Sequence, residues 1–201
     1  MSVADVAIID SGGANIASLV FALGRLSVDC RLTTDADEIS GASHVILPGV
    51  GAAEDAMRRL RQSELHTLIP TLEQPVLGIC LGMQLLAEGS QENNAECLGI
   101  VPGVAARLSV EQGYPVPNMG WCRINICAEH SLLKDIPNGA WFYFLHSYAL
   151  PVVDYTTATA DHSRSFTAIL SYRNYHATQF HPERSAASGE QLLRNFLDLG
   201  K

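Results

Sequence analysis

The stretch from residue 75 to residue 88 constrains the fold more than any other, because it reads as strand, sharp turn and helix. Residues 75–79 form a short apolar run behind a proline, which is typical of a buried strand. Residues 81–88 place apolar side chains at helical spacing, so a helix is predicted there. Cys80 lies at the junction, where the chain must turn tightly. Glycines at positions 78 and 82 let the two elements approach closely.

Two interpretations of Cys80 follow from this position. As a nucleophile, the thiol would gain from the helix N-terminus, which favours the thiolate. The backbone N–H of Leu81 could then face an oxyanion that forms on an attacked carbonyl group. This arrangement is similar to a nucleophile elbow with Cys in place of Ser. As a structural residue, Cys80 would be one more buried free cysteine, and the stretch alone leaves both interpretations open.

The first ninety residues alternate strands and helices. Such alternation predicts a parallel sheet with helices on both faces and with sites at the carboxyl ends of the strands. Gly-rich loops and Cys80 all fall at those ends. The predicted strands are residues 6–9, 29–33, 44–47 and 75–79, and the predicted helices are residues 16–26, 53–61 and 81–88, with residues 65–72 leading into the last strand.

From about residue 98 the pattern changes to short strand-like runs separated by turns. We therefore predict an α/β fold with a mainly parallel central sheet flanked by helices and additional antiparallel strands in the C-terminal half. A last helix is predicted over residues 189–199. No linker divides the chain, so residues 1–201 are expected to form a single domain. The predicted later strands are residues 104–108, 122–126, 141–150, 156–160, 166–171 and 175–180.

Composition narrows the possible functions. The formal net charge of −8 argues against a general nucleic-acid surface. No apolar run is long enough to span a bilayer, so no membrane association is expected. The five cysteines form an odd set without a C-x-x-C pair, which fits a reducing cytoplasm better than disulfides or a metal site. We expect a cytoplasmic protein without a metal or cofactor.

A thiol nucleophile needs a base, and the best candidate lies after the run 175–180. His181 and Glu183 are two positions apart just beyond the predicted strand end. The carboxylate would orient the imidazole, and the imidazole would take the thiol proton and return it to a leaving amine. Four other histidines are interpreted as structural or solvated, with His162 placed in a turn; they are His44, His66, His130 and His162.

Three motifs occur together, in chain order residues 48–51 (PGVG), 78–84 (GICLGMQ) and 179–183 (QFHPE). This combination resembles the class I, or triad, glutamine amidotransferases. Residues 142–148 (FYFLHSY), 117–121 (PNMGW) and 9–15 (IDSGGAN) are similar, within that class, to the glutaminase subunit of imidazole glycerol phosphate synthase. The resemblance spans essentially the whole chain.

The resemblance implies roles for individual residues. Cys80 would be the nucleophile, His181 the general base and acid, and Glu183 its orienting partner. The oxyanion hole would come from backbone amides at Leu81 and in the 49–51 loop, at Val50 and Gly51. That loop needs glycines because a peptide that rotates to present its N–H requires unusual φ/ψ values. Contacts to the α-amino and α-carboxylate groups of the substrate are implied for Gly51, Gln84, Glu92, Ser147 and Tyr148.

The implied reaction is hydrolysis of L-glutamine to L-glutamate and ammonia through a γ-glutamyl thioester. In the family the ammonia passes to a cyclase subunit, a (β/α)₈ barrel that forms a heterodimer with the glutaminase. There it reacts with a ribulose-phosphate-bearing precursor to give imidazole glycerol phosphate and an aminoimidazole carboxamide ribonucleotide, which link histidine and purine synthesis. By the same resemblance, the partner interface would include Asn15, Met119, Trp121 and Arg184.

The chain departs from the family pattern at two places near that interface. The usual opening Tyr-Gly-x-Gly-Asn is replaced by SGGAN, and Pro-His-Met-Gly-Trp-Asn becomes Pro-Asn-Met-Gly-Trp-Cys, with Asn118 and Cys122. Asn118 cannot carry charge and Cys122 is a poor hydrogen bonder. One hypothesis is therefore altered activation by the cyclase. Unchanged stimulation of an Asn118→His, Cys122→Asn double variant would count against it.

Other functions stay open at this point. The chain could serve as the glutaminase of a different synthase, such as the pyridoxal phosphate or anthranilate systems, or as a non-catalytic regulatory scaffold. A nucleotide-binding module is the third alternative, prompted by the Gly49-x-Gly51 pair after a strand. The third glycine of the dinucleotide fingerprint is missing, however, and Glu54 in its place would repel a pyrophosphate.

Overall fold

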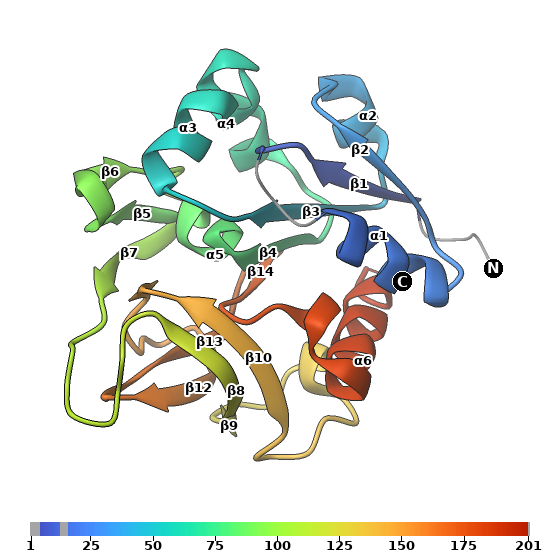
Figure 1. Cartoon of the computed structure of the whole chain (residues 1–201). Coiled ribbons are helices and arrows are strands. Elements are labelled where there is room, and N and C mark those ends of the chain that lie inside the picture. Colours follow the sequence, from blue (N-terminus) through green and yellow to red (C-terminus); the bar gives the residue numbers. More distant parts are fainter. Residues whose placement is uncertain (1–4, 13–15, 201) are drawn as a thin grey trace.

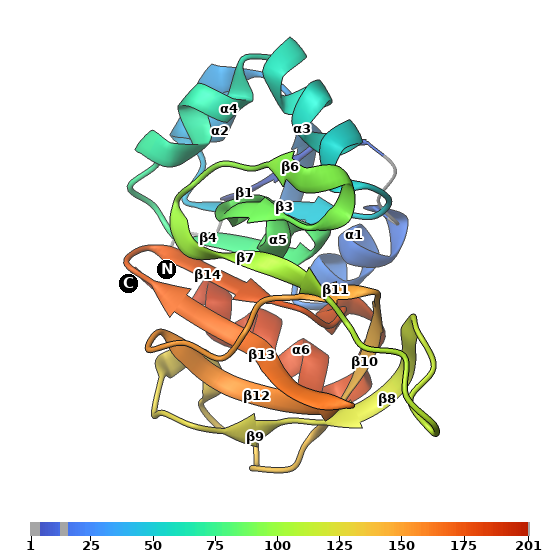
Figure 2. The same cartoon turned by 90° about the vertical axis from the view of Figure 1, so that its left-hand side faces the viewer.

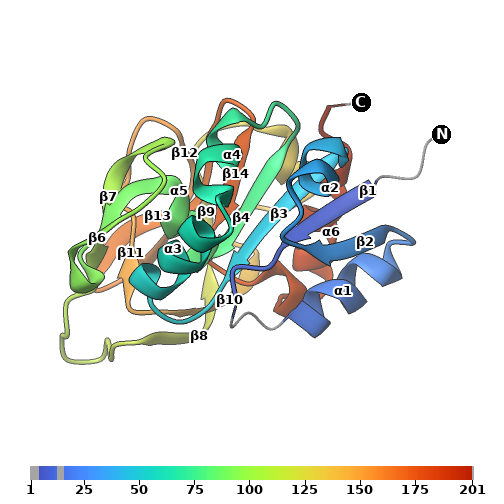
Figure 3. The same cartoon turned by 90° about the horizontal axis from the view of Figure 1, so that it is seen from above.

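A computed structural model describes residues 5–12 and 16–200 of the chain. In this part of the chain the largest sheet has eight strands, and the five from β2 to β14 run parallel while the last three are antiparallel. Figure 3 shows β1, β3 and β4 side by side. In sheet order the strands are β2 (Asp29–Thr33), β1 (Asp5–Ile9), β3 (His44–Gly49), β4 (Val76–Cys80), β14 (Tyr175–Thr178), β13 (Arg164–Tyr172), β12 (Thr156–His162) and β9 (Asn125–Ile126).

Helices cover both faces of the parallel strands, as Figure 1 shows. Alternate side chains of β1 serve the two faces, since Val6 and Ile8 pack with one set of helices and Ala7 and Ile9 with the other. This double burial explains why central strands such as β1 are continuous apolar runs, whereas the edge strand β2 is not. One face carries α1 (Ile16–Arg25) and α6 (Ala186–Leu197), and the other carries α2 (Ala36–Gly41), α3 (Ala53–Gln62) and α4 (Leu65–Leu68).

Two smaller sheets flank the large one, and Figure 2 shows both. Strands β8 and β10 form an antiparallel pair, and β11, β7, β5 and β6 form the other sheet. Among the described residues, no helix is long and apolar enough to cross a membrane. The remaining elements are β8 (Asn118–Arg123), β10 (Trp141–His146), β11 (Tyr148–Ala149), β7 (Val101–Arg107), β5 (Ala87–Ser90), β6 (Ala95–Glu96), α5 (Leu81–Leu86) and the 3₁₀ turns η1 (Ile69–Thr71), η2 (Glu92–Asn94), η3 (Ser131–Leu133) and η4 (Pro182–Arg184).

The fold class predicted from the sequence is confirmed, but several element bounds are wrong. The helix predicted over residues 81–88 ends at Leu86, and β5 begins at the next residue. The returning chain explains this early end, because Ile100 N–H donates to the Leu86 carbonyl and Gly99 N–H donates to the Ala87 carbonyl. These two carbonyls therefore bond outside the helix.

Two long predicted strands are each divided in two. The run 122–126 splits at the buried Ile124, so that β8 pairs with β10 while β9 pairs with β12. The run 141–150 splits at Ser147 between β10 and β11. His162 is also not in a turn, because it is the buried last residue of β12, with its Nε2 2.8 Å from the Pro115 carbonyl. The apolar pattern of the sequence alone does not show where a strand passes from one sheet to another.

Candidate active site

Cys80 ends β4 and immediately precedes α5, in the strained turn that the sequence predicts. Its backbone has φ 55° and ψ −106°, a conformation that residues with a side chain seldom adopt. Such strain persists only where the surrounding structure enforces it. Here neighbouring elements lie so close that a Cβ on Gly82 would come 1.8 Å from the Leu47 carbonyl oxygen. The turn therefore lifts the thiol out of the strand toward the carboxyl end of the sheet.

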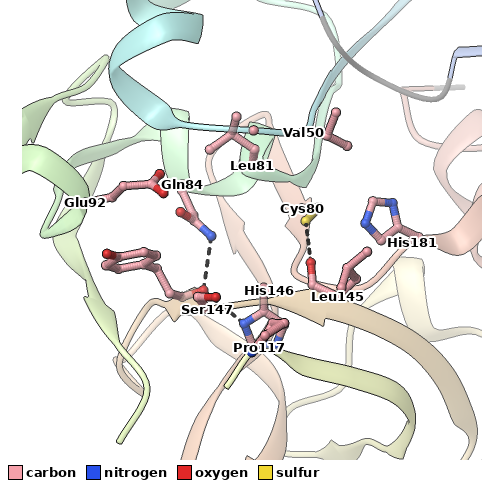
Figure 4. A pocket seen from close by; sticks show the side chains of 12 residues that line it. Val50, Cys80, Leu81, Gln84, Glu92, Pro117, Leu145, His146, Ser147 and His181 are labelled. Carbon is pink, nitrogen blue, oxygen red and sulfur yellow. Dashed lines mark hydrogen bonds between the residues drawn. The ribbon is translucent and has the colours of Figure 1, made fainter. Parts of the chain in front are cut away.

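The thiol faces a pocket of about 240 Å³, which Figure 4 shows from close by. Most residues predicted for the catalytic, oxyanion and substrate groups line this pocket. Val50 and His181 are 131 positions apart in the sequence, and the fold brings them to one pocket. The lining residues are Val50, Gly51, Cys80, Leu81, Gln84, Glu92, Pro117, Leu145, His146, Ser147, Tyr148 and His181.

His181 and Glu183 form a buried pair beside the thiol. The ring Nδ1 of His181 is 2.8 Å from Glu183 Oε1, and both side chains are less than one-tenth exposed. Burial lowers the pKa of His181, but hydrogen bonds and charge interactions with Cys80 and Glu183 outweigh it and raise this pKa from 6.5 to about 10. The site therefore favours the imidazolium form of His181 beside Cys80.

The backbone around His181 is fixed from two sides. His181 N–H donates to the Tyr143 carbonyl of β10 at 2.9 Å, and Ser185 Oγ donates to the His181 carbonyl at 2.6 Å. The preceding residue, Phe180, stacks on Phe142 with a centroid distance of 4.0 Å. The orientation of the imidazole toward Cys80 is therefore set by main-chain bonds and by core packing.

The candidate oxyanion donors lie on the wall of the same pocket. Leu81 is the first residue of α5, so its N–H has no carbonyl one turn earlier in that helix. Val50 and Gly51 follow β3, and Gly51 has φ 91°, which favours glycine. Gly49 packs tightly against α5, because an added Cβ would lie 3.0 Å from the Leu81 Cβ and Leu81 would have to shift by a few tenths of an ångström.

The predicted substrate residues differ in what else they bind. Gln84 Nε2 donates to the Tyr148 carbonyl at 3.1 Å. Glu92 Oε2 accepts a hydrogen bond from Ala53 N–H at 3.0 Å and so also caps α3. Ser147 and Gly51 line the pocket. All five residues predicted to contact the amino-acid head group therefore surround one cavity.

Two further polar side chains at the site were given no role from the sequence. Gln179 is fully buried, and its Nε2 lies 3.9 Å from Cys80 Sγ, within donating distance of a sulfur acceptor. His146 is buried in the pocket wall, and its ring Nδ1 is 2.9 Å from the Tyr148 carbonyl. Both residues stand inside the motifs that carry the family resemblance, which was the only signal available for them.

The predicted interface residues that the structure describes do not line the pocket. Met119 and Trp121 are exposed on β8, and Arg184 lies in η4 with its guanidinium carbon 4.3 Å from the centre of the Tyr143 ring. Trp121 packs edge-on against the same ring at 6.2 Å. Asn15 lies outside the described residues.

Comparison with known proteins identifies the family of this chain. The family model described as glutamine amidotransferase class-I matches residues 7–199. Solved structures with the same fold include PurLQS from Thermotoga maritima, with a TM-score of 0.75 at 16% identity over 100% of both chains. A glutamine amidotransferase from the same organism has a TM-score of 0.65 at 17% identity, over 98% of this chain and 84% of its own. The chain belongs to the class I glutamine amidotransferase family.

Within that family, the chain is similar along nearly its whole length to subunits of one particular synthase. The imidazole glycerol phosphate synthase subunit HisH of Xanthomonas euvesicatoria is 49% identical over 195 residues, covering 97% of this chain and 98% of its own. The subunit HisH 2 of Legionella pneumophila is also 49% identical, over 96% of this chain and 98% of its own.

The first testable prediction concerns the His181–Glu183 pair. In Glu183→Gln the neutral amide no longer favours the imidazolium, so the pKa of His181 should fall. In the wild type the raised pKa means that protonated His181 stabilises the fold. That contribution is complete below pH 6.5, the value for an unfolded histidine, and is lost as the pH rises through about 10. The stability difference between wild type and variant should therefore shrink across this window in urea unfolding.

A matched control for this prediction is Glu190→Gln. Glu190 is a glutamate in exposed ion pairs with Arg25 and Arg194 on the surface of α6. Exposed pairs of this kind contribute little, so no loss of stability centred on the same pH window is expected. If the difference in unfolding free energy between the wild type and Glu183→Gln stays constant between pH 6.5 and 10, Glu183 does not hold the proton on His181.

Proposed function

We propose that this protein hydrolyses L-glutamine to L-glutamate and ammonia as the glutaminase subunit of an imidazole glycerol phosphate synthase. The observation that carries the proposal is the thiol of Cys80 in a strained turn, sharing one pocket with His181, whose ring is paired with the buried Glu183. The near full-length similarity to HisH subunits supports the choice of synthase. We take the chain to be one amidotransferase domain.

The proposed chemistry begins with attack of the Cys80 thiolate on the side-chain carboxamide carbon of glutamine. The carbonyl oxygen becomes an oxyanion, and the amide N–H groups at Leu81 and in the Val50–Gly51 loop would stabilise it. The C–N bond then breaks, and the imidazolium of His181 gives its proton to the departing nitrogen, which leaves as ammonia. The product bound to the enzyme is a γ-glutamyl thioester.

The second half of the reaction releases glutamate. His181, now neutral, takes a proton from water, and the resulting hydroxide attacks the thioester carbonyl. Collapse of the tetrahedral intermediate breaks the C–S bond and regenerates the thiolate, with the proton again on His181. Glu183 would hold the ring in the tautomer that both halves need. The residues proposed to bind the α-amino and α-carboxylate groups are Gly51, Gln84, Glu92, Ser147 and Tyr148.

The proposed partner is a cyclase subunit with a (β/α)₈ barrel, which would consume the ammonia to form imidazole glycerol phosphate and an aminoimidazole carboxamide ribonucleotide. The outer face of the β8–β10 pair offers a docking surface, since its strand register places Met119 beside Leu145 and Trp121 beside Tyr143. Met119 is 68% exposed and Trp121 is 49% exposed. Asn15 and Arg184 are also assigned to this interface.

We also propose that the protein works in the cytoplasm. All five cysteines are free, including the exposed Cys127. A reducing compartment would keep the proposed nucleophile Cys80 available as a thiolate, whereas an oxidising compartment would favour its loss to oxidation.

A second prediction tests the docking surface. Trp121→Ala should weaken the complex with the cyclase by about 2 kcal/mol, or about 30-fold in Kd, because exposed Trp side chains that meet a partner are frequent hot spots. The matched control is Leu32→Ala, since Leu32 is 45% exposed on β2 at the far edge of the large sheet. Titration calorimetry of both variants against the cyclase measures the effect. Equal affinities for the two variants would place the interface elsewhere.

The function itself is tested by the source of nitrogen. The complex of this protein with the cyclase should form imidazole glycerol phosphate from either glutamine or an ammonium salt. With Cys80→Ala, formation from glutamine should stop while formation from the ammonium salt continues. Product formed from glutamine by the Cys80→Ala complex would refute the thiol mechanism. No product from wild type with glutamine, together with normal glutamate release, would point to a different synthase.

A further inference from the structure

A chain of hydrogen bonds runs from strand β8 through the pocket wall to Gln84. Cys122 Sγ lies 3.6 Å from Asn118 Oδ1, and Asn118 Nδ2 lies 3.1 Å from His146 Nε2. The other ring nitrogen, His146 Nδ1, is 2.9 Å from the Tyr148 carbonyl. The same carbonyl accepts from Gln84 Nε2 at 3.1 Å. Figure 4 shows His146 and Gln84 on the pocket wall, with dashed lines for the hydrogen bonds that they make to the Tyr148 carbonyl.

The chemistry of these groups fixes the direction of every bond. The Tyr148 carbonyl only accepts, so the proton of the His146 ring is on Nδ1. Burial lowers the pKa of His146 to about 4, although the hydrogen bond to Tyr148 opposes this effect. The ring is therefore neutral at physiological pH, and its Nε2 is an acceptor. Asn118 must then present its amide nitrogen to the ring and its amide oxygen to Cys122.

Cys122 completes the chain as a donor. Burial raises the pKa of the Cys122 thiol, and the hydrogen bond to Asn118 opposes this effect only in part. The sulfur therefore keeps its proton at physiological pH and can donate to Asn118 Oδ1. Asn118 and His146 are 3% and 5% exposed, so an unpaired nitrogen on either side chain would be costly. Burial thus favours one set of donors and acceptors for the hydrogen bonds among Cys122, Asn118 and His146.

The consequence for the pocket lies at Tyr148 and Gln84. With two donors aimed at it, the Tyr148 carbonyl has both acceptor positions in use. Gln84 commits its amide nitrogen to that carbonyl, so its amide oxygen is the end left to accept a hydrogen bond from a ligand. A primary ammonium group is a donor with no acceptor, and it suits that oxygen. Without the hydrogen bond from His146, the Tyr148 carbonyl would no longer be held in place. The orientation of Gln84, which donates to that carbonyl, would then no longer be fixed.

We propose that His146 is a positioning residue of the glutamine pocket: Asn118 holds its ring in one tautomer, and its Nδ1–H holds the Tyr148 carbonyl so that Gln84 presents its amide oxygen to the α-amino group of the substrate. This inference rests on the proposed function, because it takes the ligand to be glutamine. His146 acts through the two neighbouring residues and takes no part in the bond changes at Cys80.

The test compares two amides that each replace one ring nitrogen. In His146→Asn the side-chain nitrogen falls near the position of Nδ1 and can still donate to Tyr148. In His146→Gln the longer side chain places its amide near the position of Nε2 and leaves Tyr148 without that donor. Glutaminase kinetics are measured in the complex with the cyclase, and thermal unfolding verifies that both variants fold.

We expect His146→Gln to raise the KM for glutamine about tenfold or more with kcat within a few-fold of wild type, since a lost buried hydrogen bond at a binding site changes affinity by about that factor. His146→Asn should keep KM within about threefold of wild type. Asn118→Leu, which removes the donor to Nε2, should fall between the two. If both His146 variants raise KM equally, the residue only fills space and the proposal is overturned. If kcat falls while KM is unchanged, His146 serves the triad and the proposal is also overturned.

Alkylation of Cys80 separates failure of this proposal from failure of the proposed function. Iodoacetamide reports thiolate reactivity without recognising an amino acid, whereas a diazoketone analogue of glutamine must occupy the pocket first. We expect His146→Gln to keep the rate with iodoacetamide and to lose most of the rate with the diazoketone, read by mass spectrometry. Equal diazoketone rates for wild type and His146→Gln overturn the proposal. Absence of diazoketone labelling in the wild type instead rejects the glutamine pocket itself.

Discussion

Replacing Cys80 by alanine is expected to abolish glutamine hydrolysis, with a fall in rate of at least about 10⁴-fold, because no other group at the site can form the thioester. The fold should survive, since Cys80 is a small residue in a turn whose shape is set by its neighbours. Glutamate release in the complex with the cyclase measures the loss. Mass spectrometry of the quenched wild-type enzyme should show a glutamyl adduct that Cys80→Ala lacks.

Two controls accompany this prediction. Cys127→Ala removes an exposed free thiol away from the pocket and should leave the rate unchanged. Cys80→Gly should be as inactive as Cys80→Ala. Its free energy of unfolding should be higher than that of Cys80→Ala by about 1 kcal/mol, because glycine adopts a positive φ without the strain that a side chain causes at 55°. Residual hydrolysis above about one hundredth of the wild-type rate in Cys80→Ala would exclude the thiol as nucleophile.

Gly82→Ala is expected to have the largest effect on stability, with a loss of about 3 kcal/mol or more. An added Cβ would lie 1.8 Å from the Leu47 carbonyl oxygen, and a backbone atom of β3 cannot move away as a flexible side chain could. Either α5 shifts from the sheet, which displaces Cys80, or the protein unfolds. Urea unfolding followed by circular dichroism measures the change.

The matched control is Gly24→Ala in α1. A Cβ on Gly24 would meet no atom within 4 Å, so the gain in helix propensity should make this variant more stable by about 0.5–1 kcal/mol. The two substitutions are chemically identical and differ only in the space available. Destabilisation of Gly82→Ala by no more than about 0.5 kcal/mol would mean that β3 and α5 are not held as closely as the structure indicates.

The parallel half of the fold was predictable because each strand and helix there has its own pattern. The strand at residues 29–33 and the helix that starts at residue 53 were placed to the residue. Strands such as β1 and β3 are buried on both faces, so their apolar runs are unambiguous. The six-residue helix α2 was missed, since its signal is confined to a side-chain cap at Asp35 and one buried residue, Ile39.

The C-terminal half was less predictable because its strands change sheet within a few residues. Pattern does not show that Ile124 separates a strand facing β10 from a strand facing β12. It does not show that β8 begins as early as Asn118, since Asn and Gly are poor strand formers. These choices are made by tertiary pairing, which a single sequence does not contain.

The residues of the candidate site also differ in how far the sequence could predict them. Local chemistry indicated Cys80 and His181, since a cysteine after a buried strand and a His-x-Glu pair are readable within a few positions. Residues such as Gln84 and Glu92 came from the family resemblance. The tautomer of His146 and the contacts of Gln179 depend on atoms from distant segments, so no local pattern could have predicted them. The roles assigned to all these residues stay predictions until the variants are measured.

The most direct measurement of the central claim is glutamate release from glutamine by the wild-type protein, alone and with a cyclase subunit that carries its bound substrate. We predict slow release by the isolated protein and a strong rise with the loaded cyclase, with Cys80→Ala inactive in both conditions. Release that depends on Cys80 but does not respond to the cyclase would keep the chemistry and refute the partner. Release that does not depend on Cys80 would contradict the account as a whole.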